Sequence, residues 1–388
     1  MRILLVTHYY AEHRGGVEIV AAELARRLSA RGLDITWMAS AGDAEPVARG
    51  EAVTRRPVPA WNLTERRLGF PYPLWSPLAL LRLSQKVRCA DVVHLHDSLY
   101  LGNVVAYLWA RCYGKPVVVT QHVGPVPYSS RLLRGMLGLA NRTLARLVLG
   151  GCDQAVFISP RVQAYFSRLF RFRHAPVYLA NGVNTERFYP VSEESRQALR
   201  RRLGWPADRK VRLFVGRFVE KKGLPLLRQL ATARPQDLWV FVGWGGDDPS
   251  RWGFDNVRSA GALPQKAIAD YYRAADLLVL PSVGEGFPLV VQEAMACGLP
   301  ALISPETLEG APDAAEVVAS ASLDVASWQQ AIALLDRAEP LRQRQSVAEF
   351  AKCWSWDAVA DRFVELFTTL IPPSGPHAAT RGCRPGMP

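Results

Sequence analysis

Short apolar runs alternate with longer amphipathic segments along most of the chain. The short runs are rich in β-branched residues and therefore predict strands, while the amphipathic segments between them predict helices. This alternation is typical of parallel sheets with helices on both faces, so we expect an α/β protein with two Rossmann-like halves. The predicted strands are residues 3–7, 34–40, 91–96, 116–121, 155–159 and 177–181 in the first half, and 211–217, 238–243, 276–281 and 300–304 in the second.

The segment after the first strand has a clear helical pattern. Residues 18–31 place apolar side chains on one face and arginines on the other, and Gly32 supplies a stop signal. We expect the arginines to face solvent. The apolar set is Ile19, Ala22, Leu24 and Leu28, and the polar set is Arg26, Arg27 and Arg31.

The length of 388 residues favours two domains, because a single hydrophobic core usually stops growing well below this size. Turn residues and a proline between 181 and 197 place the boundary at about residue 185. We expect domains at 1–184 and 185–354. Residues 372–388 are rich in Pro and Gly with almost no apolar content, so they predict a disordered tail.

The net charge of +12 is confined to the first half of the chain. Residues 1–180 hold 23 Lys and Arg against 11 Asp and Glu, whereas the remainder holds 24 of each. The excess indicates either a domain that faces a polyanion, such as anionic lipid or nucleic acid, or a basic solubilising surface. No nucleic-acid recognition module accompanies it, so we expect no nucleic-acid partner.

The six cysteines show neither paired nor metal-type spacing, which argues against a disulfide framework and a zinc site. The first apolar run is too short for a signal peptide, and no run of about 18 apolar residues predicts a membrane span. We therefore expect a cytoplasmic protein whose membrane contact, if any, is peripheral.

The stretch GEGFPLVVQEAMACGLP at 284–300 carries two carboxylates, Glu285 and Glu293, in an apolar run. It predicts a helix from near Pro288 to Gly298, directly after a strand. Such a helix start suits a phosphate, and carboxylates accept hydrogen bonds from sugar hydroxyls. The stretch indicates a ligand that is phosphorylated and polyhydroxylated, unless both acids are surface residues stabilised by the helix dipole.

The stretch VGRFVEKKG at 215–223 places Arg217 and Lys222 after the first strand of the second half. Doubly wound sheets bind ligands at this position. The two cations are suited to a diphosphate, Arg through its planar fork and Lys as a point charge. The alternative is a solvated surface loop.

The first half carries a second set of candidates at strand ends. Gly15 and Gly16 follow the first strand without forming a dinucleotide fingerprint. His94 and His96 share one face of a strand, but no third residue has the spacing of a metal ligand. Asp97 ends that strand and is a candidate partner for an acceptor hydroxyl, or a simple loop cap.

Together, VGRFVEKKG, VRSAGALPQKAIADYYRAADLLVLPS and GEGFPLVVQEAMACGLP closely resemble the retaining GT-B glycosyltransferases of family 4, also called glycosyl transferases group 1. The resemblance extends to about residue 370. It implies the GT-B fold, with two Rossmann-like domains facing each other across a cleft and a final helix at about 355–371 that packs back on the first domain. It also implies that the second domain binds a nucleotide sugar.

The resemblance assigns roles to individual residues. Arg217 and Lys222 correspond to the pair that neutralises the pyrophosphate, Glu285 to the residue that holds hydroxyls of the donor sugar, and Glu293 to a ribose contact. The remaining donor-site residues by resemblance are Gly15 and Gly16 near the phosphate, His122 beside the sugar, Gly261 and Leu263 at the base, and Phe287, Leu289 and Val290 at the phosphate.

We therefore predict a retaining glycosyltransferase that moves a hexose from a UDP- or GDP-linked sugar to a lipid-linked or polysaccharide acceptor. No cofactor or metal is expected, because the chain lacks a D-x-D motif and cations serve the leaving diphosphate. Arginines interleaved with leucines and aromatics at 65–88 and 127–151 predict peripheral membrane contact through the first domain. The alternatives are a GT-B protein that binds a nucleotide or glycan without catalysis, and a sugar-nucleotide epimerase.

Overall fold

The computed structural model describes residues 1–371 apart from 14, 42–52, 62–71, 125–130 and 284–286. The chain divides into two compact domains. The first domain comprises Met1–Ile158, Val162–Leu179 and the chain from Asp357 onward, and the second comprises Ser159–Arg161 and Ala180–Trp356. The expected tail at 372–388 lies outside the described residues.

The first domain is built on a seven-stranded parallel sheet of order β3-β2-β1-β6-β7-β8-β9. A short antiparallel pair, β4 and β5, lies apart from this sheet. The strands are β1 Arg2–Val6, β2 Asp34–Ser40, β3 Val53–Val58, β4 Ala60–Trp61, β5 Leu74–Trp75, β6 Val92–His96, β7 Val117–Gln121, β8 Gln154–Phe157 and β9 Val177–Tyr178.

The second domain repeats this topology in a six-stranded parallel sheet of order β12-β11-β10-β13-β14-β15. In both sheets the strand order reverses beside the first strand, between β1 and β6 and between β10 and β13. Loops at the carboxyl ends of strands beside such a reversal form the usual ligand crevice. The strands are β10 Val211–Val215, β11 Leu238–Val242, β12 Val257–Ser259, β13 Leu277–Leu280, β14 Ala301–Ile303 and β15 Ala319–Ser320.

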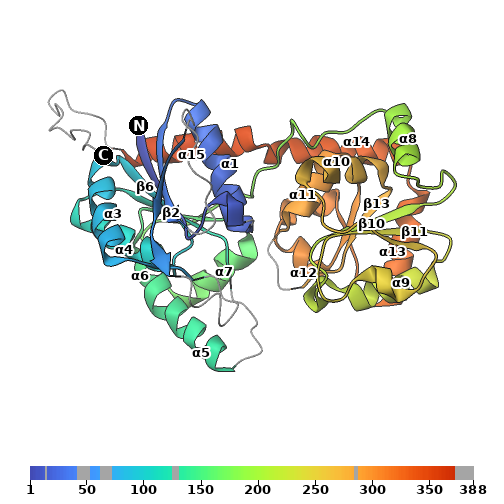
Figure 1. Cartoon of the computed structure of the whole chain (residues 1–388), viewed down its shortest axis with the longest axis horizontal. Helices are drawn as coiled ribbons and strands as arrows, with labels where there is room; N and C mark the ends of the chain where they lie inside the picture. Colours follow the sequence, from blue (N-terminus) through green and yellow to red (C-terminus); the bar gives the residue numbers. More distant parts are fainter. Residues whose placement is uncertain (14, 42–52, 62–71, 125–130, 284–286, 372–388) are drawn as a thin grey trace. The chain divides into compact units, whose positions relative to one another are not determined.

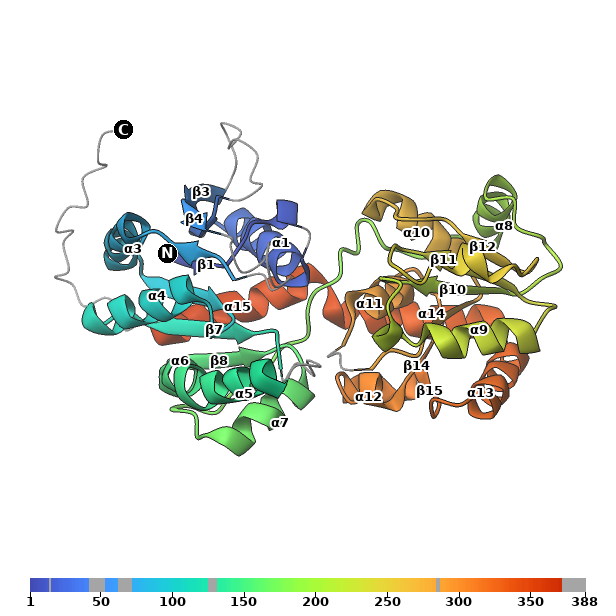
Figure 2. The ribbon, with the colours of Figure 1, turned by 60° about the horizontal axis from the view of Figure 1, so that its bottom comes forward.

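Helices cover both faces of each sheet (Figures 1 and 2). The first domain carries α1 Gly16–Ala30, α3 Pro77–Cys89, α4 Leu101–Cys112, α5 Arg131–Ala140, α6 Arg146–Gly151, α7 Pro160–Leu169 and α15 Trp356–Leu370. The second carries α8 Glu193–Arg202, α9 Leu224–Ala233, α10 Gln265–Ala274, α11 Leu289–Ala296, α12 Pro305–Leu308, α13 Val325–Arg337 and α14 Pro340–Ala351.

The local sequence explains where these elements begin and end. The central strands are buried at every position, as expected of parallel strands covered on both faces. The Ser76 hydroxyl accepts a hydrogen bond from the backbone N–H of Ala79 and so caps the start of α3. Gly298, at φ 73°, takes the left-handed conformation that ends the α11 turn.

The last helix, α15, packs in the first domain and corrects one expectation for α1. Arg27 was predicted to face solvent, but it is only 7% exposed and its guanidinium lies 2.8 Å from the Asp357 carboxylate of α15. Arg31 binds Asp361 on the same helix at 2.6 Å. The pattern within α1 could not reveal these partners, because they lie more than 300 residues away in the sequence.

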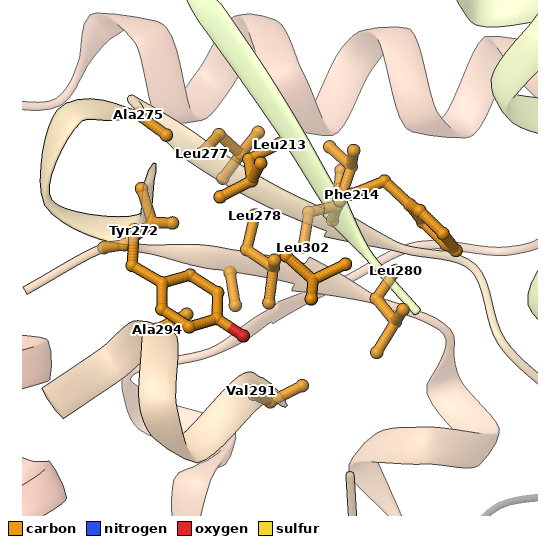
Figure 3. Packing of buried hydrophobic residues seen from close by; sticks show 14 of the residues in the cluster. Leu213, Phe214, Tyr272, Ala275, Leu277, Leu278, Leu280, Val291, Ala294 and Leu302 are labelled. Atoms are coloured by element: carbon orange, nitrogen blue, oxygen red, sulfur yellow. The ribbon is translucent and has the colours of Figure 1, made fainter. Parts of the chain in front are cut away.

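The second domain has a continuous core between its sheet and α10 and α11. Leu213, Leu278 and Leu302 project from three neighbouring strands, and Tyr272 of α10 extends its ring toward α11 beside Ala294 (Figure 3). These side chains are essentially inaccessible to solvent. The packing fixes α10 and α11 against the sheet.

Among the described residues, Cys112, Cys152, Cys297 and Cys353 are free thiols. Across the residues that the structure describes, no helix is both long and apolar enough to cross a membrane.

Candidate functional site

The predicted cations of the second domain lie in the loop that follows β10, at the reversal of strand order. Arg217 is exposed, and Lys222 is half-buried in the short turn before α9. The Lys222 side chain lies against Gly216, since a Cβ built there would be 3.7 Å from its Cε atom. Both cations therefore come from the loop expected to meet a ligand.

Glycine allows this loop to approach the loop after β13 closely. Gly223 has φ 75°, and a Cβ at this position would be 2.5 Å from the carbonyl oxygen of Pro281. The Val283 backbone N–H also donates to the Lys221 carbonyl at 2.9 Å. The two loops beside the strand-order reversal are thus joined. Glu285, predicted to follow Val283 into the site, lies outside the described residues.

The loops after β11 and β12 are joined to the same cluster by backbone hydrogen bonds. The Phe218 N–H donates to the Trp244 carbonyl at 2.6 Å, and the Gly243 N–H donates to the Gly261 carbonyl at 2.9 Å. Gly261 has φ 68°, and Leu263 is half-buried against the domain core. The predicted base-binding segment therefore lies two strands away from the cationic loop.

Trp244 is not among the residues predicted from the sequence. It lies two residues after the end of β11. Trp244 is 61% exposed, which is unusual for a large apolar side chain. Its loop lies between the cationic loop after β10 and the loop after β12. The signal available in the sequence was an aromatic residue one position beyond the glycine that ends a buried strand.

The start of α11 agrees with the predicted helix. The helix begins at Leu289 with Pro288 as its N-cap, so the N–H groups of Leu289 and Val290 lie in the first turn, where no intrahelical acceptor exists. Phe287 is 5% exposed and packs against Trp354. Its side chain belongs to the core, which leaves only its backbone for a ligand.

Glu293 lies in α11 and is held by a buried tyrosine. The Tyr272 hydroxyl donates to Oε2 of Glu293 at 3.0 Å. Burial raises the pKa of Glu293 to about 7, although the Tyr272 hydrogen bond and the charge of Arg187 act in the opposite direction. Burial also raises the pKa of Tyr272, so this hydroxyl remains a donor. The pair fixes one carboxylate oxygen.

In the first domain, Gly15 and Gly16 lie at the start of α1. A Cβ at Gly15 would be 2.1 Å from Oε2 of Glu18, so a larger residue here would require the Glu18 carboxylate to move. The other Glu18 oxygen lies 2.9 Å from Nε2 of His8, and the His8 ring stacks on Tyr100. Burial opposes ionisation of Glu18, but the His8 contact brings its pKa below the ordinary value.

His122 and Asp97 lie together at the carboxyl ends of β7 and β6. One Asp97 oxygen accepts hydrogen bonds from the backbone N–H groups of His122, at 2.8 Å, and Val123, at 3.1 Å. Asp97 is 3% exposed and has φ 67°, a conformation uncommon outside glycine. This geometry fits the loop-capping alternative, because the carboxylate is directed to the loop after β7.

The two strand histidines contact different partners. Nε2 of His94 lies 2.8 Å from the Thr120 hydroxyl, and Nδ1 of His96 lies 2.9 Å from Nε2 of His122. Burial lowers the pKa of His94 to about 3. Within the described parts of the chain, no group of three His, Cys, Asp or Glu residues has the arrangement of a metal site.

The predicted membrane-contact segments are only partly exposed. In α5 and the turn after it, Met136, Leu139 and Leu144 are exposed beside Arg134 and Arg142. In the other segment, by contrast, Trp75 is 3% exposed. Its ring fills the space above Gly102 at the start of α4. Trp75, one of the aromatic residues in the predicted segment 65–88, is therefore a core residue and not available to a membrane surface.

Solved structures establish the class of fold. Sucrose-phosphate synthase from Thermosynechococcus elongatus aligns with a TM-score of 0.75 at 22% identity, over 95% of this chain and 99% of that one. Anabaena HepE in complex with UDP-glucose aligns with a TM-score of 0.69 at 18% identity, over 95% and 100%. With its two parallel-sheet domains, the protein has the predicted GT-B fold.

Sequence comparisons establish the family. The model of Glycosyltransferase Family 4 matches residues 14–187, and that of Glycosyl transferases group 1 matches 195–347. A D-inositol 3-phosphate glycosyltransferase from Thermobispora bispora is 31% identical over 92% of this chain and 90% of its own. The chain belongs to glycosyltransferase family 4, group 1, and is a glycosyltransferase.

Proposed function

We propose that the protein transfers a hexose from a UDP- or GDP-linked sugar to a lipid-linked or polysaccharide acceptor, with retention of the anomeric configuration. The observation that carries this proposal is the cationic loop after β10, which presents Arg217 and Lys222 at the reversal of strand order. This chemistry suits a pyrophosphate, and the family is one of glycosyltransferases.

The second domain would hold the nucleotide. Arg217 and Lys222 would neutralise the pyrophosphate, and the first-turn N–H groups of α11 would approach its oxygens. Glu293, held by Tyr272, would accept hydrogen bonds from ribose hydroxyls. The base would lie at Gly261 and Leu263 and stack on the exposed ring of Trp244.

Glu285, His122, Gly15 and Gly16 would act at the donor sugar and its phosphate. Glu285 would position sugar hydroxyls rather than attack the anomeric carbon. In this scheme the departing diphosphate is stabilised by protein cations and a helix dipole, without a metal. Activity that survives exhaustive treatment with a chelator would support the metal-independent scheme, and loss restored by one divalent cation would contradict it.

We place the acceptor at the cytoplasmic membrane surface because of the exposed segment around α5. It combines apolar side chains with arginines, as in helices that lie in a lipid interface. The relative named above is named for a small phosphorylated polyol. A water-soluble acceptor of that kind is therefore the main competing outcome.

The donor experiment measures release of free UDP or GDP from a panel of nucleotide hexoses, with and without acceptor. We expect one nucleotide sugar to be consumed, and Glu285→Ala to abolish turnover while nucleoside diphosphate still raises the melting temperature. A protein that binds the nucleotide but never turns over would instead be a binding protein. Undiminished turnover by the variant would remove Glu285 from the proposed site.

The membrane experiment measures sedimentation with vesicles that contain anionic phospholipid. Met136→Ser combined with Leu139→Ser should reduce binding, whereas Leu334→Ser, a similarly exposed leucine of the second domain, should not. Binding should also weaken with salt, because arginines contribute. Equal binding by all three proteins would contradict the assignment of this face.

A further inference from the structure

The hydrogen bond between His96 and His122 joins a fully buried ring to one that lies at the strand end. Nδ1 of His96 lies 2.9 Å from Nε2 of His122, and the rings stack with centroids 5.0 Å apart and planes 16° from parallel. The backbone of His122 is fixed at the same time by Asp97. His122 is thus held at both its ring and its main chain.

Both rings are neutral, so the contact between them holds a single proton. Burial lowers the pKa of His96 well below its ordinary value, and the nearby rings of His94, His122 and His8 lower it further. Burial also lowers the pKa of His122, against the opposing charges of Asp97 and Glu18. In one arrangement His96 donates to His122, and in the other the direction is reversed.

The surroundings of the other ring nitrogen of His96, Nε2, decide which histidine donates the hydrogen bond. Nε2 of His96 is buried and has no hydrogen-bond partner among the described residues. The neighbouring His94 ring already directs its Nε2 to Thr120, and Phe363 and Phe367 of α15 flank it. A proton on Nε2 of His96 would be an orphaned buried donor, which is rarer in proteins than an unpaired acceptor.

We propose that His96 is a positioning residue that donates its Nδ1 proton to Nε2 of His122 and thereby fixes the other proton of His122 on Nδ1. His122 then presents an N–H donor to an acceptor oxygen of the ligand. That the ligand is the sugar nucleotide rests on the proposed function. Among the described residues, no side chain or main-chain group hydrogen-bonds to Nδ1 of His122.

The first test reads the tautomer directly by nitrogen NMR of the full chain with labelled histidine. We expect Nδ1 of His122 to be protonated and Nε2 to be bare. His96→Asn keeps an amide N–H close to the position of Nδ1 and should preserve this state, whereas His96→Leu should release it. His122 protonated on Nε2 in the wild-type protein, or the same tautomer in His96→Leu, would overturn the proposal.

The second test compares kinetics with the donor identified above. His96→Leu should lower kcat/KM for the donor on the order of ten- to a hundredfold, as expected of a group that orients another, and His96→Asn should restore most of it. Equal losses in His96→Leu and His96→Asn would overturn the orienting role.

His94→Leu is the matched control, because it removes a buried histidine of the same strand that does not hydrogen-bond to His122. It should leave the tautomer of His122 unchanged. Because both histidines lie in the first domain, circular dichroism and a cooperative thermal transition of the full chain check that each variant folds. If the wild-type protein turns over no nucleotide sugar, the proposed function fails, while the tautomer measurement still decides whether His96 orients His122.

Discussion

The two domains share one strand order but differ in the chemistry of the loops at its reversal. In the first domain these loops bring together neutral imidazoles, a tyrosine and the His8–Glu18 pair. In the second they bring together Arg217, Lys222 and the exposed Trp244. Among the described residues, the same backbone topology therefore carries imidazole and carboxylate groups in one domain and a pair of cations in the other.

This difference indicates that two domains of the same architecture suit different chemical groups of a ligand. Cations are effective where formal negative charge must be neutralised, as on a diphosphate. Neutral histidines and a fixed carboxylate suit hydroxyl groups, which need directional hydrogen bonds rather than charge. Fold alone does not determine which role a domain takes, because the loop residues decide it.

The largest effect is expected from removal of a cation of the second domain. Lys222→Ala should lower kcat on the order of 10²- to 10³-fold, because a group that stabilises the departing diphosphate is lost. Lys221→Ala is the matched control, since Lys221 is the exposed neighbour in the same turn. Kinetics with the identified donor would measure both, and similar values for the two variants would contradict a specific role for Lys222.

Removal of the exposed aromatic should have the next largest effect. Trp244→Ala should weaken binding of UDP or GDP about tenfold or more, since stacking of one base on an aromatic ring contributes about 1 to 3 kcal/mol. Trp244→Phe should retain most of the affinity. Calorimetry with nucleoside diphosphate and with inorganic pyrophosphate separates base from phosphate contacts.

Trp61→Ala provides the control for this experiment, because Trp61 is 64% exposed but lies in the first domain. It should bind both ligands as the wild-type protein does. If Trp244→Ala weakened pyrophosphate and nucleotide equally, its ring would act on the loop rather than on the base, and the nucleoside would have to be bound elsewhere.

Most of the fold could be predicted from the sequence, because buried parallel strands are continuous apolar runs. All ten predicted strands are present, and α11 lies close to its predicted bounds. The strands that were missed are short or carry polar residues: β3 contains two arginines and a proline, and β15 has only two residues. Such segments become strands through pairing with a neighbour, which periodicity does not report.

The candidate site was predictable where a motif and a strand end coincide. Arg217 and Lys222 lie at the expected loop for this reason. The contacts of Tyr272 with Glu293 and of His96 with His122 were not predicted, because each joins two elements at a distance set only by packing. The buried position of Asp97 was missed for a related reason: alternation along a strand does not specify what covers its end.

The close approach of two loops in the second domain gives a test that measures stability rather than activity. Gly223→Ala should destabilise this domain by about 2 to 4 kcal/mol, because the residue has a left-handed φ and its Cβ would clash with the Pro281 carbonyl. Gly204→Ala shares the positive φ but has open space, so it should cost only about 1 kcal/mol. If urea unfolding gave the same loss of stability for Gly223→Ala and Gly204→Ala, the contact between the loops after β10 and β13 would not contribute to stability.

The smallest expected effect concerns the pH dependence of stability through Glu293. Its pKa in the folded protein is about 7, above its ordinary value, so the folded state binds this proton more tightly than the unfolded state does. The free energy of unfolding therefore falls as the pH rises from the ordinary pKa of a glutamate to about 7, and then levels off. Glu293→Gln should remove this loss, which we place at about 2 kcal/mol after allowing for partial exposure.

Melting temperatures at pH 5 and pH 8 would measure this effect. The variant should exceed the wild-type protein clearly at pH 8 and only slightly at pH 5. Glu293→Gln should at the same time bind nucleoside diphosphate more weakly, because it loses a carboxylate for the ribose. A variant that gained neither stability at pH 8 nor a binding defect would show that Glu293 is an ordinary helix residue, and the second domain would then owe its ligand site to its cations alone.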